Sequence, residues 1–360
     1  MNTKKFTISV LALALALLAA AGGTVAAVDP YFHYHGPLSG LYYSLDNERS
    51  QNDGILKHFD YDALVTGTSM AENFKTSQVD EMFGVNSVKA TFAGASYAEI
   101  NENLETAFEY NQNIKLVIRP LDYNYLMDDA NRKRDDLGTY PTYLYDNNPF
   151  NDVNYIFNKD ILFGICLPMI KNALAGQTGG ITSFDDYANW MDTASFGADT
   201  VLSDRTENYQ APTVKEPLLD ETREAIRENI EENVIAIAKS HPDTDFYYYI
   251  TPYSAAWWGR QMENGTLYRW IGAEEYAISL ILQCDNIHLY SFNTMTDITC
   301  NLDNYSDECH HGDWINSQIL EYISQGTGLL TTDNYQDYIA QETELYQGYN
   351  YDSLLSQKSM

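Results

Sequence analysis

Positive charge is scarce in this 360-residue chain. It has 21 lysine and arginine residues against 51 aspartate and glutamate residues, which gives a formal net charge of −30. A surface this acidic disfavours nucleic acids and anionic lipid headgroups as partners, because both repel carboxylates. The chain is not a disordered acidic polymer, since 44% of its residues are hydrophobic and 13% are aromatic, which is enough to build a core.

Cysteine is also rare, and none of the four cysteines belongs to a Cys-x-x-Cys pair: Cys166, Cys284, Cys300 and Cys309. The sequence therefore lacks the usual spacing of a zinc site, and we expect neither a metal nor a cofactor. In an exported protein a disulfide between Cys300 and Cys309 would close a short loop. Buried free thiols are an equally good interpretation.

The N-terminus carries one long uncharged run. Lys4 and Lys5 precede it, and it extends from Phe6 to Val28. The run fits a secretory signal peptide, with a small-residue cleavage site at 25–27, or a single membrane-spanning helix. Its length favours an uncleaved anchor. Because the two lysines stay inside the cell, the rest of the chain is expected outside the cytoplasm, tethered to the membrane or secreted.

Residues 1–28 are thus predicted to be a signal peptide or membrane anchor, and residues 29–59 a connector. His33 and His35 alternate in this connector as a metal pair would. No third ligand is near in sequence, so packing among the surrounding aromatic residues is the favoured interpretation.

From about residue 60 to residue 325, strands alternate with helices. The predicted strands are 63–65, 87–92, 114–118 (stopped by Pro120), 245–250 and 287–292, and the predicted helices are 71–82, 97–110, 219–239, 267–282 and 315–323. Such alternation implies βαβ units and a parallel sheet. The period is lost over about 121–218, which we interpret as an insertion, and residues 326–360 are expected to form a C-terminal tail or helix.

In a parallel α/β sheet the functional edge lies at the carboxyl ends of the strands. Ser69, Gly94 and Asp122 all fall there. Ser69 follows strand 63–65 and the breaker Gly67, where a hydroxyl projects beside the free backbone N–H groups of a helix N-terminus. The alternative is that Thr68 or Ser69 merely caps the helix, which is the commoner task of such residues.

A second group of polar residues follows the last strand. Asp307 lies three residues before His310 on a turn that leads into a helix. This spacing lets the carboxylate hold Nδ1–H of the imidazole while Nε2 faces a hydroxyl. His311 is a rival for the histidine, and Asp303 and Asp313 are rivals for the carboxylate.

These motifs resemble those of the SGNH (GDSL-like) hydrolase superfamily: Gly67-Thr68-Ser69, Gly94 after the second strand, and Asp307-x-x-His310. With the N-terminal membrane segment, the stretch 305–314 looks like the cell-surface branch that includes D-alanyl-lipoteichoic acid transfer and polysaccharide O-acetylation proteins. The resemblance implies a flavodoxin-like three-layer α/β/α domain. Two departures stand out: Thr68 replaces the family's aspartate, and its Gly-x-Asn-Asp block is missing after the third strand.

The resemblance implies a nucleophile Ser69, a general base His310 and an orienting carboxylate Asp307. It implies oxyanion donors at Ser69 and Gly94, with Asn124 as a candidate third donor. The expected function is that of an exported serine esterase or O-acyltransferase acting on acylated glycans or cell-envelope polymers, with a membrane partner that supplies acyl groups as a further expectation. A non-catalytic surface or assembly protein that keeps the fold is the alternative, and it predicts that Ser69 and His310 lie apart.

Overall fold

The computed structural model describes residues 3–134 and 141–359, and these form two compact units. Unit 1 comprises residues 1–59 and 135–183, and unit 2 comprises residues 60–134 and 184–360. The expected insertion, 121–218, is therefore divided between them, and its residues 135–140 lie outside the described residues. The expected connector, 29–59, is part of unit 1 together with the N-terminal helix.

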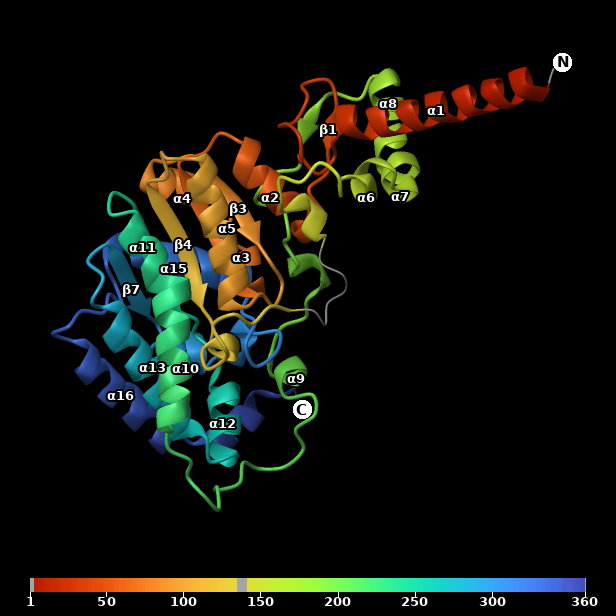
Figure 1. Cartoon of the computed structure of the whole chain (residues 1–360). Helices are drawn as coiled ribbons and strands as arrows, with labels where there is room; N and C mark the ends of the chain where they lie inside the picture. The colour runs from red at the N-terminus through yellow and green to blue at the C-terminus, as the bar shows by residue number, and fades with distance from the viewer. Residues whose placement is uncertain (1–2, 135–140, 360) are drawn as a thin grey trace. The chain divides into compact units, whose positions relative to one another are not determined.

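Unit 2 is built on a five-stranded parallel sheet in the order β3-β2-β4-β6-β7 (Figure 1). Its strands are β2 (Ala63–Gly67), β3 (Ser87–Thr91), β4 (Leu116–Leu121), β6 (Asp245–Ile250) and β7 (Ile287–Ser291). Numbered along the chain within this sheet, the order is 2-1-3-4-5, that of flavodoxin-like folds, in which ligands bind at the carboxyl edge where the order reverses. That switch point lies between β2 and β4, so the predicted α/β fold with a parallel sheet is confirmed.

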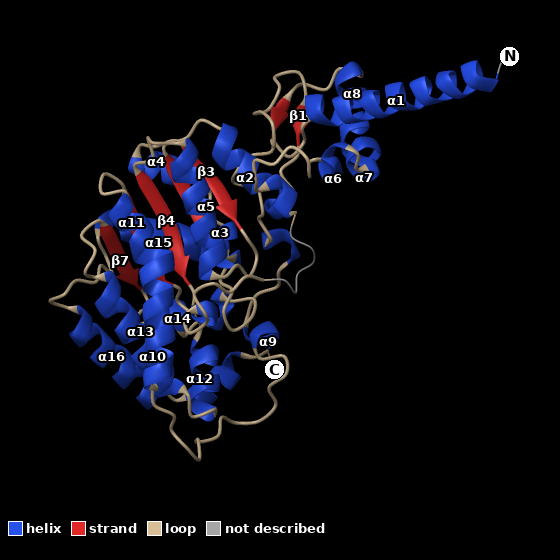
Figure 2. Cartoon of the chain, viewed as in Figure 1, coloured by secondary structure: helices blue, strands red, loops and turns tan. Residues whose placement is uncertain are grey.

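Helices cover both faces of this sheet (Figure 2). On one face α4 and α15 pack on alternate residues of β2 and β4, such as Val65 and Ile118. On the other face α5 packs against β6, with the rings of Phe108 and Phe246 5.9 Å apart. The helices longer than a single turn in unit 2 are α4 (Thr76–Phe83), α5 (Tyr97–Tyr110), α10 (Asp220–Ile230), α11 (Ala236–Ser240), α12 (Ala255–Glu263), α13 (Leu267–Ile281), α15 (Asp313–Gln325) and α16 (Tyr335–Gly348).

The 3-10, π-helical and one-turn α-helical segments of unit 2 are α3 (Ser69–Glu72), η1 (Tyr123–Tyr125), η4 (Met191–Thr193), α9 (Ala198–Val201), η5 (Glu231–Ile235), α14 (Thr296–Thr299), η6 (Leu302–Asn304) and η7 (Tyr351–Gln357). Residues 326–360, expected as a tail or helix, thus form α16 and η7. Tyr346 of α16 is fully buried and stacks on Trp258.

Pro120 does not end the third strand as predicted, because β4 continues to Leu121. Its pairing with β2 stops earlier, at Val65 and Ile118, so the proline lies beyond that ladder. The ring of Pro120 instead occupies the space beside Gly67, where an added Cβ would come within 2.7 Å of it. Gly67 has φ 148°, so glycine is required there by both conformation and space.

The predicted helix 71–82 is interrupted, with α3 ending at Glu72 and α4 beginning at Thr76. Lys89 of β3 is fully buried and donates hydrogen bonds to the carbonyl oxygens of Glu72 and Phe74, the latter at 3.1 Å. A buried ammonium group needs such acceptors, and a helix break supplies them, because carbonyls at a helix end have no partner within the helix.

The predicted helix 219–239 is also not uniform, since the π-helical turn η5 lies between α10 and α11. Arg119 of β4 is fully buried beneath this turn and donates from Nη1 to Asn233 O at 2.7 Å. Its guanidinium also lies over the rings of Tyr97 and Tyr248. The irregular turn therefore presents a carbonyl to a buried cation, as π-bulges can do.

Unit 1 contains the N-terminal helix and several short segments. They are α1 (Thr3–Val28), β1 (Tyr42–Tyr43), α2 (Glu48–His58), η2 (Thr142–Leu144), α6 (Val153–Ile156), α7 (Lys159–Ile161), η3 (Leu162–Cys166), α8 (Leu167–Leu174) and β5 (Gly180–Ile181). Val25 and Val28, in the last turns of α1, pack with Ile161 and Cys166 in a small core. Asp29 follows directly; it is fully buried and accepts hydrogen bonds from the backbone of three residues, 33–35, and from Tyr155 Oη.

α1 is long and apolar enough to cross a membrane, although a signal sequence near an N-terminus would meet the same criterion. The side chains of residues 3–20 are exposed, and burial begins at Gly22. The helix therefore has an exposed outer part and an inner end that belongs to the core of unit 1.

Two glutamates meet in the core of unit 2 where α13 packs on α16. Glu274 and Glu342 are both fully buried, and they interact electrostatically. Tyr123 Oη also donates to Glu274. Burial raises the pKa of Glu274 to about 7, with the hydrogen bonds acting in the opposite direction. Burial and the charge of Glu274 hold the pKa of Glu342 well above its ordinary value.

The glutamate pair should make unit 2 less stable as pH rises. Between the ordinary glutamate pKa of 4.5 and about 7, the unfolded chain releases a proton that the folded chain keeps, so the free energy of unfolding falls with pH. One retained proton corresponds to about 1.4 kcal/mol per pH unit. Glu342, whose pKa is also raised, retains a proton of its own, and Glu342→Gln removes that proton while keeping the side-chain shape. The variant should therefore stabilise the protein at pH 8 more than at pH 5 in urea unfolding.

Glu344→Gln is the matched control, because Glu344 is exposed on the same helix and loses the same charge. We expect Glu344→Gln to change the midpoint equally at both pH values. Parallel pH dependence in the wild type and Glu342→Gln would show that the pair holds no extra proton.

Candidate functional site

A chain of three side chains lies at the carboxyl edge of the sheet. Ser69 Oγ is 2.8 Å from His310 Nε2, and His310 Nδ1 is 2.7 Å from Asp307 Oδ2. Ser69 is half-buried, and the His310 and Asp307 side chains are 34% and 55% exposed. The structure therefore brings together the three residues that the sequence motifs singled out, with the spacing that proton transfer from a hydroxyl requires.

The turn that carries the histidine is held by the same carboxylate. Asp307 Oδ1 accepts hydrogen bonds from the backbone N–H groups of Cys309 and His310, each at 2.7 Å. Burial opposes ionisation of Asp307, but these bonds and His310 outweigh it and lower the Asp307 pKa to about 2. Asp307 is therefore a carboxylate at neutral pH, with one oxygen fixing the turn and the other facing the imidazole.

The pKa of His310 is raised above its ordinary value of 6.5. Burial lowers it, but the hydrogen bond and charge of Asp307, together with the charge of Asp122, act more strongly in the opposite direction. A raised pKa makes the imidazole a stronger base, which favours removal of a proton from Ser69.

Thr68, not Ser69, provides the side-chain cap of α3. Thr68 Oγ1 accepts a hydrogen bond from Met70 N at 3.2 Å, and Ser69 is the first residue of the helix. The capping role that was the alternative for this stretch therefore belongs to Thr68, which leaves the Ser69 hydroxyl free to point towards His310.

Thr68 is in turn held by Asp122, a buried aspartate that directly follows β4, the other strand at the switch point. Its hydroxyl donates to Asp122 Oδ2 at 2.5 Å, and Asp122 Oδ1 accepts from Thr251 and Tyr253 at 2.9 and 3.3 Å. Asp122 is 2% exposed, and burial raises its pKa although the three hydroxyls oppose the shift. One carboxyl group thus joins the ends of β2, β4 and β6 beneath the nucleophile position.

Trp190 also contacts Ser69 and His310, although no sequence motif pointed to it. Its indole Nε1 donates to Ser69 O at 3.1 Å, its backbone N–H donates to Asn73 Oδ1, and its ring meets the His310 ring edge-on at 5.6 Å. Trp190 lies in the stretch without periodicity, where no pattern linked it to Ser69. It holds both ends of α3 and one side of the imidazole.

Further aromatic rings extend from Trp190 and form what we call the aromatic ledge: Trp190, Phe196 and Trp314. Phe196 stacks on Trp190 at 6.4 Å and contacts Trp314 at 4.9 Å. Trp314 is 43% exposed, yet its orientation is fixed by a hydrogen bond from Nε1 to Asn304 Oδ1 at 3.1 Å. The ledge is a partly exposed apolar surface that adjoins the imidazole.

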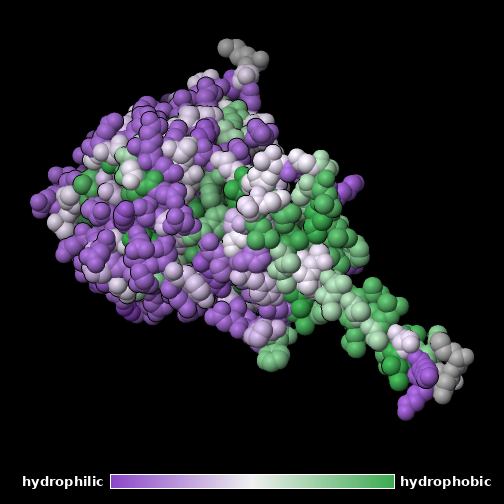
Figure 3. All heavy atoms as spheres, turned by 90° about the horizontal axis from the view of Figure 1, so that it is seen from above, coloured by the Kyte–Doolittle hydropathy of each residue, from purple (hydrophilic) through white to green (hydrophobic). Residues whose placement is uncertain are grey.

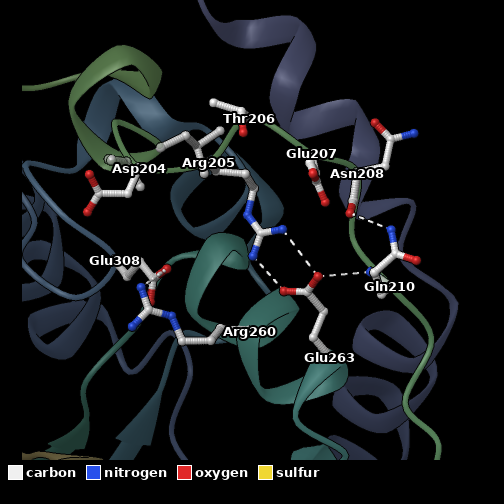
Figure 4. A pocket seen from close by; sticks show the side chains of 11 residues that line it. Asp204, Arg205, Thr206, Glu207, Asn208, Gln210, Arg260, Glu263 and Glu308 are labelled. Atoms are coloured by element: carbon white, nitrogen blue, oxygen red, sulfur yellow. Dashed lines mark hydrogen bonds and ion pairs between the residues drawn. The ribbon is translucent and has the colours of Figure 1, made fainter.

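On another side of the histidine turn lies a polar pocket of about 460 Å³ (Figure 4). Two ion pairs line it, Arg205 with Glu263 at 2.5 Å and Arg260 with Glu308 at 2.5 Å. Glu308 directly follows Asp307, and its carbonyl accepts hydrogen bonds from the backbone and side chain of Ser254. The pocket wall and the turn that holds His310 therefore share one residue.

The remaining predicted oxyanion residues follow the neighbouring strands. Gly94 lies in the turn between β3 and α5 with φ 64°, and its carbonyl accepts a hydrogen bond from Arg134. Asn124 is exposed in η1, three residues after β4 ends. Both are on the carboxyl edge, as is Ser69, and their role as donors stays a prediction.

The other residues considered for the roles of base and carboxylate lie in different environments from His310 and Asp307. His311 is buried, and burial lowers its pKa to about 4. Asp313 forms an ion pair with Lys75 at 2.8 Å, and Asp303 is exposed.

Other candidate sites have structural partners. His33 contacts Asp152 and the ring of Tyr155, and His35 Nδ1 lies 2.7 Å from Gly36 O, so both pack within unit 1. Cys300 and Cys309 are free thiols, as are the other two cysteines.

Comparisons with known proteins add one distant likeness. No family model matches the chain, and no curated protein matches it. The chain is similar to a solved structure described as a candidate platelet activating factor from Streptococcus pneumonia, at 14% identity and a TM-score of 0.35, over 81% of this chain and 91% of that one. Values this low support no assignment of function.

Removal of the Asp122 carboxyl should destabilise the site. In Asp122→Ala the hydroxyls of Thr68, Thr251 and Tyr253 lose their shared acceptor, and an unsatisfied buried polar group costs about 1–3 kcal/mol. Asp122→Asn keeps an acceptor oxygen and should cost less. Urea unfolding of the variants measures the difference.

Asp128→Ala is the control, since it removes an aspartate that forms a partly exposed ion pair with Arg132. Such pairs contribute about 0–1 kcal/mol. If Asp122→Ala were no more destabilising than Asp128→Ala, the hydroxyls would not depend on Asp122.

Proposed function

We propose that this protein is an exported serine esterase or O-acyltransferase of the SGNH type, acting on acyl esters of cell-envelope or extracellular glycans. One observation carries the proposal: Ser69, His310 and Asp307 form a continuous hydrogen-bonded chain at the switch-point edge of a flavodoxin-ordered sheet. Such a chain is recognised by geometry and roles, independently of sequence order.

In the proposed reaction Ser69 Oγ attacks the acyl carbonyl carbon while its proton passes to His310 Nε2. Asp307 accepts the hydrogen bond from Nδ1–H, which keeps Nε2 directed at the hydroxyl and stabilises the imidazolium. When the tetrahedral intermediate collapses, the ester oxygen leaves with the proton from His310. The product is an acyl-enzyme on Ser69 and a free alcohol.

The second half of the reaction is the reverse, with a new nucleophile. Water or a sugar hydroxyl gives its proton to His310 Nε2 and attacks the acyl carbon, and Ser69 recovers its proton as it leaves. Hydrolase and transferase differ only in this acceptor. The oxyanion would be met by the backbone N–H groups of Ser69 and Gly94 and by the Asn124 side chain, each donor being worth about 2.7–4 kcal/mol in related sites.

The surroundings support a sugar as the alcohol part. An exposed aromatic face such as the ledge offers an apolar surface of fixed orientation, and the pocket presents planar polar side chains already held by ion pairs. Two arginines and four carboxylates line the pocket, so its charge favours a neutral polyhydroxylated group over an anion.

The short distance between Ser69 and His310 speaks against the alternative, a non-catalytic surface or assembly protein. That alternative requires the two residues to lie too far apart for a hydrogen bond. At 2.8 Å they are in direct hydrogen-bond contact.

Retention of α1 as a membrane anchor is part of the proposal. A signal-peptidase cut after Ala27 would remove Val25, which is fully buried in the core of unit 1. Because the last turns of this apolar helix complete the core of unit 1, cleavage would disrupt that core, whereas retention of the helix preserves it. The domain outside the membrane would then act on substrates near its surface, with a membrane partner as a source of acyl groups.

The purified full-length protein should react with a fluorophosphonate probe at Ser69 and hydrolyse acetylated oligosaccharides. Ser69→Ala should abolish labelling, and His310→Gln should reduce acetate release by a factor of 10² or more, since general-base catalysis contributes about 10²–10⁴. Labelling is read by peptide mass spectrometry and acetate release by a coupled assay.

Ser96→Ala is the matched control, because Ser96 caps α5 at the same edge of the sheet. It should label as the wild type does. A folded wild type that neither labels nor releases acetate would refute the enzyme proposal.

The dependence of kcat/KM on pH should report His310. The base must be neutral, so activity should fall at low pH, with a midpoint above 6.5 because the His310 pKa is raised. In Asp307→Asn the hydrogen bond to the carboxylate and its charge are lost, whereas burial and the charge of Asp122 remain, so the midpoint should move to lower pH while the plateau rate falls. Asp303→Asn, at an exposed position of the same loop, should leave the midpoint unchanged. An unmoved midpoint in Asp307→Asn would exclude Asp307 as the partner of the base.

A further inference from the structure

The exposed large apolar side chains of this protein are concentrated in unit 1. Outside that unit, the described residues of this kind are only Met82, Tyr110, Val214, Leu219 and Trp314. In unit 1 most of them occupy the outer part of α1 and a second stretch, residues 150–174, which contains α6, α7, η3 and α8; Tyr34, Leu38 and Tyr42 lie outside both. We call this second stretch the apolar shoulder. Figure 3 shows hydrophobic atoms gathered along the projecting helix and beside it, while much of the remaining face is hydrophilic.

The apolar shoulder presents six large side chains to solvent: Phe150 (86%), Val153 (49%), Phe157 (48%), Phe163 (66%), Leu167 (41%) and Leu174 (85%). At the same time its inward residues Tyr155, Ile161 and Cys166 are buried against α1. The segment therefore carries large apolar side chains on both sides, with Lys159 and Asp160 exposed among those on the outer side. One side completes the core of unit 1, and nothing among the described residues covers the other. Large apolar side chains gathered at the surface in this number mark an interaction site.

The length of α1 indicates what covers the exposed side of the apolar shoulder. The last charge before the apolar run is Lys5, and a membrane helix needs about 20 residues, or about 17 at the least, to cross the hydrocarbon layer. Counted from Phe6, 20 residues end at Val25 and 17 end at Gly22. Val25 is already inside the core of unit 1, and Gly22 lies against the ring of Phe157, 3.1 Å from where a Cβ would be.

A spanning α1 therefore cannot stop short of unit 1. The exposed part, up to about residue 20, provides only some 15 residues after Lys5, or about 22 Å of helix against a hydrocarbon layer of about 30 Å. The last turns of α1 must lie at the depth of the outer leaflet, and the helices packed around those turns must lie there too. Lys159 and Lys171 accompany them, and long lysine side chains can reach the headgroups from such a position.

We propose that the apolar shoulder lies in the outer leaflet of the membrane that α1 crosses, so that unit 1 is an interfacial platform and not a water-exposed stalk. The ligand is the lipid bilayer itself, through its acyl chains, because the acidic chain as a whole disfavours anionic headgroups. The proposal rests on α1 spanning the membrane and is independent of the esterase chemistry.

Tryptophan quenching by brominated lipid tests the proposal on the full-length protein in phosphatidylcholine vesicles. All five native tryptophans lie in unit 2 and give a constant background: Trp190, Trp257, Trp258, Trp270 and Trp314. Phe163→Trp and Leu167→Trp each add one indole at an exposed position of the shoulder. Dibrominated phosphatidylcholine should remove most of the added fluorescence in both variants.

Tyr110→Trp is the matched control, because Tyr110 is 43% exposed, close to the 41% of Leu167, but lies at the end of α5 in unit 2. Its added fluorescence should be unaffected by the brominated lipid. As a second measurement, a photoactivatable phosphatidylcholine should label wild-type peptides from residues 150–174 as well as from α1.

Two results would overturn the proposal. If the vesicles carry the protein but the shoulder variants are quenched no more than Tyr110→Trp, the shoulder does not enter the leaflet. If the protein does not float with the vesicles, α1 does not span and the platform fails with it. Neither result bears on Ser69, whose reaction with a fluorophosphonate is measured separately, so failure of the enzyme proposal remains distinguishable.

Discussion

The contact between Ser69 and His310 joins residues that are 241 positions apart, and it depends on the order of the strands. Because β2 is the first strand of the sheet but lies next to β4, its carboxyl end opens at the switch point. The turns after β2, β3, β4 and β7 then reach the same edge, and the histidine turn arrives there from the far end of the chain. A different strand order would leave both residues intact and separate them.

Asp122 shows how the edge is stabilised at this switch point. Strands that diverge lose their ladder hydrogen bonds, as β2 and β4 do beyond Val65 and Ile118. The buried carboxyl replaces those bonds by accepting three hydroxyls from Thr68, Thr251 and Tyr253. Asp122 thus supplies a carboxyl group directly beside Thr68 from the end of the neighbouring strand.

Regular elements could be predicted from sequence, and irregular ones could not. Strand 245–250 and helix 97–110 have the predicted bounds, because local periodicity alone defines them. The break before α4 and the π-turn η5 have no local signal. Each exists because a buried cation from the sheet, Lys89 or Arg119, needs a backbone carbonyl, and the identity of that partner depends on the tertiary fold.

The same distinction applies to the candidate site. Ser69, Asp307 and His310 could be selected from sequence, since each belongs to a short motif with chemical meaning, although their catalytic roles stay a proposal. Trp190 could not be selected, because its contacts with Ser69 and His310 are made by a residue 121 positions away from the serine in a segment without periodicity.

For the N-terminal segment, the sequence alone left a signal peptide and an anchor as alternatives, and the structure of unit 1 bears on this choice. A cleavable signal should be dispensable to the mature fold, whereas Val25 and Val28 are fully or almost fully buried and pack with Ile161 and Cys166. Removing them would open a cavity in a small core, and lost buried methyl groups cost about 0.5–1.5 kcal/mol even for a single methylene. The last turns of α1 are therefore part of the core of unit 1, which supports the proposal that α1 is retained.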